Sequence, residues 1–188
     1  MNSSQPSRAF DPRPAREQTP VTGQLGPGKM AGAEPVNNGK KRILLADDDN
    51  GVRELLGRVL EYENYEVVEA KTGTETIRKF EADPPDLMLL DLNMPEKTGW
   101  EAFGRICEKH PFVPVIVITA RPHQYAHAVE LGVDGLMEKP LNIALLLETI
   151  EGLLAETESD RTRRLTNPEF KTALLYRAAG NHAKETIT

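Results

Sequence analysis

Four apolar runs in this sequence each end in side chains that could do chemistry. Asp47 and Asp48 follow the first run, Asp91 the third, Thr119 the fourth and Lys139 the fifth. Three converging carboxylates would raise one another's pKa values unless a cation neutralised them. Oxygen ligands without cysteine or histidine suit Mg²⁺, which accepts one or two carboxylates and keeps several waters. A hydroxyl and an ammonium beside that metal would complete a cradle for a phosphoryl group, which an aspartate can also accept covalently.

A parallel sheet would bring these side chains to one edge. Five apolar runs are spaced widely enough for a crossover helix between successive runs, and they cover residues 43–46, 65–68, 87–90, 115–118 and 136–137. The runs are unbroken rather than alternating, which is typical of strands covered on both faces. Helical periodicity is clear after the first run, at Val52, Leu55, Leu56, Val59 and Leu60. The sequence therefore predicts an α/β fold, a doubly wound (βα)5 arrangement around a five-stranded parallel sheet.

The segments on either side of this pattern differ from it in composition. Residues 1–40 form a Pro/Gly-rich leader with few large apolar side chains, and we expect this leader to be disordered. The folded domain is expected over 41–155. The tail, 156–188, is too short for an ordinary DNA-binding output domain.

Within the tail, Asn167 and Pro168 are typical of a helix start, with asparagine as the N-cap and proline at the first helical position. A short helix is therefore predicted over 168–179. The nearby arginines, Arg161, Arg163 and Arg164, are expected to be solvated charges.

Charge and cysteine content exclude several classes of protein. Residues 43–155 carry 10 basic and 21 acidic side chains, a net charge of −11, which is unsuited to coating nucleic acid or an anionic membrane. The single cysteine, Cys107, excludes an internal disulfide and is expected to be a small core or boundary residue. The sequence has no apolar run approaching the ~20 residues that span a bilayer. We therefore expect a cytoplasmic protein with no direct contact with nucleic acid or membrane.

Residues 41–155 resemble the receiver domain of two-component response regulators, which has a flavodoxin-like, CheY-like fold. The resemblance rests on four segments: ILLADD at 43–48, LLDLNMP at 89–95 with Gly99, VITA at 117–120, and GVDG at 132–135 leading to Lys139 and Pro140. It implies a phosphorelay protein in which Asp91, as 4-aspartylphosphate, carries a phosphoryl group received from a sensor histidine kinase or a histidine phosphotransfer protein. It also implies a slowly autodephosphorylating switch and not a turnover enzyme.

The resemblance also assigns roles around Asp91. Asp48, Asp91 and the backbone carbonyl of Asn93 would hold Mg²⁺, with Asp47 acting directly or through water. Lys139 would pair with the phosphoryl oxygens. Two further groups would bond those oxygens, namely the Thr119 hydroxyl, after swinging inward, and the backbone N–H of Ala120. The Lys139–Pro140 peptide bond is cis in the family.

The resemblance places the output on the face of the fourth helix, fifth strand and fifth helix. Many receivers have an aromatic switch residue on the fifth strand, where this sequence has Leu136. A downstream protein would bind this face, and a phosphorylation-dependent dimer is left open. Asn93 and Arg121 flank the expected approach of water and should tune the lifetime of the phosphorylated state.

Two other functions remain open at this point. An aspartate-nucleophile, Mg²⁺-dependent phosphatase of the haloacid-dehalogenase kind uses similar residues, but it normally has a second aspartate where this sequence has Asn93. A receiver-like binding module that ignores phosphorylation would not need Asp91 or Lys139, and both are present.

Overall fold

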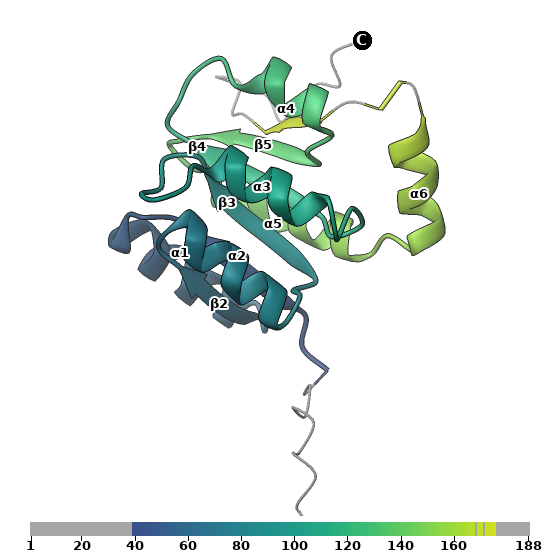
Figure 1. The fold of residues 1–188 in the computed structure, drawn as a ribbon. Helices are drawn as coiled ribbons and strands as arrows, with labels where there is room; N and C mark the ends of the chain where they lie inside the picture. Colours follow the sequence, from purple (N-terminus) through teal and green to yellow (C-terminus); the bar gives the residue numbers. More distant parts are fainter. Residues whose placement is uncertain (1–38, 168, 171, 176–188) are drawn as a thin grey trace, which may run out of the picture. The chain divides into compact units, whose positions relative to one another are not determined.

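The computed structural model describes residues 39–167, 169–170 and 172–175. Six parallel strands form one sheet in the order β2-β1-β3-β4-β5-β6 (Figure 1). The strands are β1 (Arg42–Ala46), β2 (Glu66–Ala70), β3 (Leu87–Asp91), β4 (Val115–Thr119), β5 (Gly135–Glu138) and β6 (Ala173–Leu175). The helices are α1 (Asn50–Tyr62), α2 (Gly73–Ala82), α3 (Gly99–Cys107), α4 (Tyr125–Leu131), α5 (Ile143–Leu154) and α6 (Glu158–Thr166). The predicted doubly wound parallel sheet is confirmed, with one strand more than expected.

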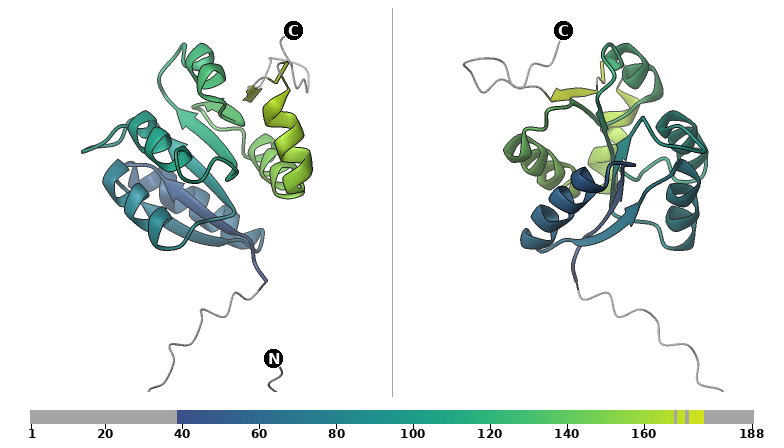
Figure 2. Two further views of the ribbon diagram at one scale, coloured as in Figure 1. Left: turned by 45° about the vertical axis from the view of Figure 1, so that its right-hand side comes forward. Right: turned by 90° about the vertical axis from the view of Figure 1, so that its left-hand side faces the viewer.

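Helices cover both faces of this sheet, as the right-hand view in Figure 2 shows. Leu44, Met88 and Val117 point to the face covered by α2, α3 and α4. Their chain neighbours on the same strands point to the opposite face, where α1 and α5 supply Leu56, Leu60, Leu146 and Ile150. Because successive side chains of a strand alternate between faces, both faces of each central strand are buried. This explains the unbroken apolar runs in the sequence.

Side-chain caps fix the helices that flank the site. The Asp49 carboxylate accepts hydrogen bonds from the amides of Gly51 and Val52 and so begins α1 directly after the aspartates of the first loop. Thr98 and Glu101 form a capping box that begins α3 shortly after β3. Such reciprocal bonds satisfy amides that have no partner inside the helix. Both caps therefore set the length and path of loops that leave the carboxyl ends of strands.

The predicted apolar stripe of α1 is wrong at one position. Leu55 is 55% exposed. Arg53 is buried instead, on the same face as Leu56 and Leu60. A basic side chain therefore lies on the buried face of α1, where the pattern indicated only apolar residues.

The expected helix over 168–179 is wrong where the structure describes it. Thr157 caps α6 upstream of that range, with acidic residues in the first turn and arginines in the last, which suits the helix dipole. Asn167 is the C-cap of this helix rather than an N-cap. Residues 173–175 pair with β5 as a strand, because that edge would otherwise lack backbone partners. Residues 176–179 lie outside the described residues, as does the leader up to residue 38.

None of the helices in the described part of the chain has the length and apolar character needed to cross a bilayer.

Candidate functional site

The site lies where β1 and β3, which are neighbours in the sheet, reach their carboxyl ends. Asp47 follows β1, and Asp91 is the last residue of β3. One carboxylate oxygen from each of Asp47, Asp48 and Asp91 lies within 4.8 Å of the others. Asp47 and Asp91 are buried, whereas Asp48 is exposed. The sequence prediction that these three aspartates converge at one edge is therefore confirmed.

Lys139 reaches the aspartates from the end of β5. Its ammonium lies 2.8 Å from Asp47 Oδ2 and 3.2 Å from Asp91 Oδ1. The amide of Lys139 donates to the carbonyl of Thr119 at 2.8 Å, which fixes the lysine backbone against β4. The Lys139–Pro140 peptide bond is cis. One cation thus faces two buried carboxylates from two different strands.

The two oxygens of Asp91 have different surroundings. Oδ2 accepts a hydrogen bond of 2.5 Å from the amide of Asn93. Oδ1 is buried and has no hydrogen-bond partner among the described residues, although the Lys139 ammonium lies 3.2 Å away. A buried polar atom without a hydrogen bond is unfavourable, so Oδ1 is suited to a further ligand beside Lys139.

Burial raises the pKa of Asp91, and the negative charge of Asp47 raises it further. Lys139 and the amide of Asn93 oppose this shift without cancelling it. For Lys139, burial lowers the pKa, but the two aspartates outweigh burial and the net shift is upward. The site therefore keeps its cation and holds a carboxylate that would gain from a second positive charge.

These observations fit a divalent cation such as Mg²⁺. The donor set consists of carboxylates, one of them exposed to solvent at Asp48, and it offers no nitrogen or sulfur ligand. Asp91 Oδ1, which has an ion pair with Lys139 but no hydrogen bond, and the excess of negative charge both point to a cation.

Thr119 and its neighbours lie at the adjacent end of β4. The Thr119 hydroxyl is buried and accepts a hydrogen bond of 2.9 Å from the amide of Arg121. The guanidinium of Arg121 donates from Nε to the Asn93 side-chain oxygen. Ala120 is exposed between them. Within the described residues, neither Thr119 nor Ala120 is hydrogen-bonded to the carboxylates, so these two predicted residues stand beside the aspartates without contacting them.

Leu136 lies in β5 and is fully buried, so it is part of the core that α4 also covers. It pairs in register with Leu174 of β6. The chain's own sixth strand therefore lies next to the position where many receivers have an aromatic residue.

Arg53 is a site residue that the sequence reasoning missed. Its guanidinium donates to the Asp47 carbonyl at 2.7 Å and to the Asn50 side-chain oxygen at 2.9 Å, and it also lies 3.5 Å from Glu69. These bonds hold the backbone of the aspartate loop. The sequence does contain a signal for this role. Arg53 lies three positions before Leu56 and seven before Leu60, a spacing that places it on the same face of a helix as these leucines.

Gly99 also has a structural role that its place in the sequence motif did not indicate. A Cβ atom at this position would lie 2.2 Å from the Asp91 carbonyl and 2.8 Å from the Leu92 Cα. The start of α3 therefore approaches the backbone of the acceptor strand so closely that only glycine fits.

Comparisons with known proteins all indicate the same family. A sequence model described as the response regulator receiver domain matches residues 43–151. Response regulator RR06 of Streptococcus pneumoniae is 39% identical over 114 residues, which are 60% of this chain and 52% of that protein. Transcriptional regulatory protein TrcR of Mycobacterium tuberculosis is 32% identical over 144 residues, 76% of this chain and 54% of that protein. The chain spans about half the length of these curated relatives.

Solved structures show the same fold. A CheY-like response regulator receiver domain protein from Methanospirillum hungatei is 30% identical with a TM-score of 0.59, over 66% of this chain and 98% of that one. Response regulator TrrA of Thermotoga maritima, solved in complex with Mg²⁺ and BeF, is 35% identical with a TM-score of 0.57, over 60% of this chain and 98% of that one.

Proposed function

The chain belongs to the response regulator receiver domain family, and we propose that it is a phosphoacceptor switch in which Asp91 takes a phosphoryl group from a phosphohistidine. The observation that carries the proposal is the environment of Asp91. This buried carboxylate shares one edge of the sheet with Asp47 and Asp48, faces Lys139, and has one oxygen without a hydrogen bond.

In the proposed reaction a carboxylate oxygen of Asp91 attacks the phosphorus of the donor. A P–O bond forms while the P–N bond to the imidazole breaks, and the imidazole leaves as the neutral base after taking up a proton from solvent. Water later attacks the same phosphorus, releases inorganic phosphate and restores the carboxylate. The raised pKa of Asp91 does not prevent this reaction, because Lys139 and the Asn93 amide favour the ionised form.

Asp47, Asp48, Asp91 and the backbone carbonyl of Asn93 are the residues we assign to Mg²⁺. The bound ion would neutralise part of the negative charge on the phosphoryl group and on the aspartates. The protein's own contribution is positional: Arg53 holds the loop of Asp47, and Gly99 allows α3 to approach the acceptor strand closely.

Lys139 and Thr119 are assigned to the product state. A phosphoryl group on Asp91 adds negative charge and acceptor oxygens. Lys139 is already within 3.2 Å of Asp91 and would pair with those oxygens. The Thr119 hydroxyl and the Ala120 amide would be drawn to them from the neighbouring strand end. Such a change shifts the balance between two conformations rather than building a new fold.

The test is incubation with acetyl phosphate and Mg²⁺, followed by intact mass measurement over time beside an Asp91→Asn control. We expect a single Mg²⁺-dependent phosphoryl adduct that hydroxylamine removes and that the control lacks. Continuous release of phosphate with multiple turnovers would instead favour the haloacid-dehalogenase-like phosphatase. No adduct, confirmed with a phosphohistidine donor, would leave a phosphorylation-independent binding module.

The donor would be a sensor histidine kinase or a histidine phosphotransfer protein, and the target a downstream protein that binds the face of α4, β5 and α5. A phosphorylation-dependent dimer through that face is a further candidate. Because such kinases draw their phosphoryl group from ATP, we place the protein in the cytoplasm.

A further inference from the structure

The C-terminal segment of the described chain packs on the sheet edge and on α4. We call the described residues 156–167, 169–170 and 172–175 the strap. Its first part is α6, and its last part is β6, which pairs with β5 in parallel register from Gly135↔Ala173 to Met137↔Leu175. In Figure 1 the yellow arrow of β6 lies beside β5, at the edge of the sheet opposite β2. The β6 part of the strap therefore occupies the backbone edge that β5 would otherwise present to solvent.

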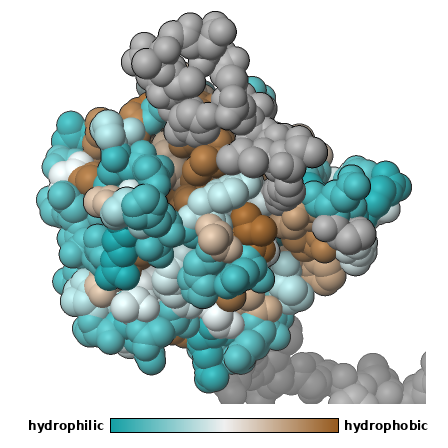
Figure 3. Space-filling view, turned by 90° about the horizontal axis from the view of Figure 1, so that it is seen from above, coloured by the Kyte–Doolittle hydropathy of each residue, from teal (hydrophilic) through white to brown (hydrophobic). Residues whose placement is uncertain are grey.

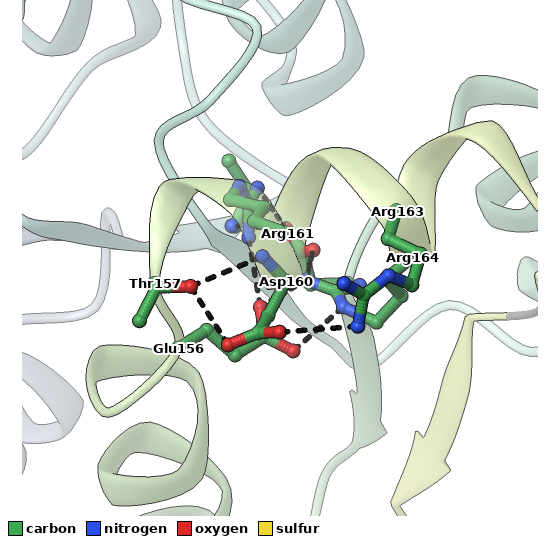
Figure 4. Close-up of polar contacts among 8 residues, drawn as sticks. Glu156, Thr157, Asp160, Arg161, Arg163 and Arg164 are labelled. Carbon is green, nitrogen blue, oxygen red and sulfur yellow. Dashed lines mark hydrogen bonds and ion pairs between the residues drawn. The ribbon is translucent and has the colours of Figure 1, made fainter.

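The α6 part of the strap is anchored by a buried ionic cluster (Figure 4). Asp134, directly before β5, accepts hydrogen bonds from Arg161 at 3.0 Å and Arg164 at 2.8 Å, and from the Val115 amide at 2.8 Å. Arg164 also donates to Glu156 at 2.7 Å. Asp134 and Arg161 are 5% and 6% exposed. Removing one partner of a buried pair of this kind is strongly destabilising, because the other charge is left buried without compensation.

The β6 part contacts the elements that carry the switch, through its pairing with β5 and through α4. The Tyr125 hydroxyl, at the start of α4, donates to the Thr172 carbonyl at 3.1 Å. Leu174 packs against the core cluster that includes Leu136. The strand itself has only three residues, and its release would expose Leu175, which is 3% exposed and packs in the core cluster on the α1 and α5 face.

Seen from above in Figure 3, the hydrophobic residues that are coloured lie in small groups between hydrophilic ones. Because β6 pairs with β5, a partner that pairs with the same backbone edge of β5 would compete with β6.

The contacts of Thr119 link the phosphorylation site to this edge. Its hydroxyl is bonded to the Arg121 amide, and Arg121 in turn contacts Asn93. Movement of Thr119 toward a phosphoryl group on Asp91 would lengthen the bond to Arg121 and shift the loop that ends at Gln124, the residue before α4. Tyr125 is the first residue of α4, so its bond to the strap would be lost or weakened by the same shift.

We propose that the strap is an autoinhibitory contact: in the unphosphorylated protein β6 covers the edge of β5 beside α4, and phosphorylation of Asp91 releases β6 while α6 stays anchored through Asp134. This inference rests on the proposed phosphoacceptor function. The released edge presents unpaired backbone N–H and C=O groups, together with the Leu136 side of the core, to a partner. By linkage, whatever weakens β6 must also favour the phosphorylated state by the same factor.

The test is hydrogen–deuterium exchange of the full chain with and without Mg²⁺ and BeF₃⁻, a mimic of the phosphoryl group. We expect backbone amides of β5 and of residues 172–175 to exchange about tenfold faster when the mimic is bound, while amides of α6 change little. Asp91→Asn should show no change. Faster exchange in the Asp91→Asn variant as well, or equal acceleration throughout α6, would overturn the proposal.

A matched pair of tyrosine variants tests the linkage. Tyr125→Phe removes only the hydroxyl bonded to Thr172. It should accelerate exchange of residues 172–175 without BeF₃⁻ and tighten BeF₃⁻ binding by a similar factor. Tyr62→Phe, at an exposed position on α1, should change neither. Equal BeF₃⁻ affinity in wild type and Tyr125→Phe, with faster exchange in the variant, would refute coupling.

The same measurements separate the two proposals. Failure of Asp91 to form an adduct or to bind BeF₃⁻ would contradict the phosphoacceptor function. Normal adduct formation with unchanged exchange at β5 and at residues 172–175 would contradict the strap alone.

Discussion

The Lys139 ammonium lies closer to Asp47 than to Asp91, at 2.8 Å against 3.2 Å. The lysine therefore neutralises a neighbour of the acceptor at least as strongly as the acceptor itself, and an oxygen of Asp91 remains without a hydrogen bond. This arrangement makes the stability of the site depend on cations.

Lys139→Met should reveal that dependence. The variant leaves two buried carboxylates without their cation, and we expect it to lose about 1–3 kcal/mol of stability without Mg²⁺. Added Mg²⁺ should then raise the melting temperature of the variant by more than that of wild type. Thermal melts in Mg²⁺ and in EDTA measure this difference, and an equal rise in both proteins would contradict it.

Gly99→Ala should disturb the acceptor strand. The new Cβ would meet the Asp91 carbonyl at 2.2 Å, so the backbone must shift, and a loss of about 1–3 kcal/mol is expected together with slower labelling by acetyl phosphate. Gly104→Ala is the matched control, because it lies in the same helix with nothing within 4 Å of its Cβ. That control should gain about 0.5–1 kcal/mol in urea denaturation. Similar behaviour of the two variants would show that the close approach is unimportant.

Arg53→Met should weaken Mg²⁺ binding without removing a ligand. Arg53 holds the Asp47 carbonyl, and groups that orient metal ligands commonly contribute about tenfold or more to metal affinity. Calorimetric titration with Mg²⁺ measures the loss. Arg58→Met, at an exposed arginine of the same helix that pairs with Glu54, is the control and should bind Mg²⁺ as wild type does. An unchanged affinity for Arg53→Met would show that the aspartate loop does not need this support.

Cys107 should be an unreactive thiol in the folded protein. Burial raises its pKa to about 11, with a smaller contribution from the negative charge of Asp134. Iodoacetamide at about pH 8 should therefore label it slowly until denaturant exposes it, since the thiolate is the nucleophile. Labelling at the same rate with and without denaturant would contradict the shift.

The same shift predicts how stability changes with pH. An unfolded chain releases the thiol proton near pH 8.5, whereas the folded chain keeps it to about pH 11. Between these values the unfolded state binds fewer protons, so the contribution of Cys107 to stability falls as pH rises. Cys107→Ala should lose less stability than wild type over this window, as urea denaturation at several pH values would show.

Much of the core fold could be predicted because each central strand is buried on both faces, which leaves unbroken apolar runs in the sequence. Asp47, Asp48, Asp91 and Lys139 could be placed together because each follows such a run, and parallel strands bring their carboxyl ends to one edge. The position of Thr119 could be predicted in the same way, but its bond to Arg121 could not, because that bond depends on the path of a loop.

The C-terminal part could not be predicted for a different reason. Asn167 and Pro168 favour a helix start by local preference, yet residues 173–175 form a strand because the edge of β5 lies beside them. Arg161 looked like a solvated charge because its partner, Asp134, lies 27 residues earlier in the chain. Long-range pairing of this kind leaves no periodic trace in the sequence.

The anchoring of α6 has a consequence for protein engineering. A module excised at residue 151, where the family match ends, would lack both guanidinium partners of the buried Asp134 carboxylate. Chimeras that transplant this receiver onto other proteins should therefore carry the chain through Leu175, with the fusion junction placed after the sixth strand.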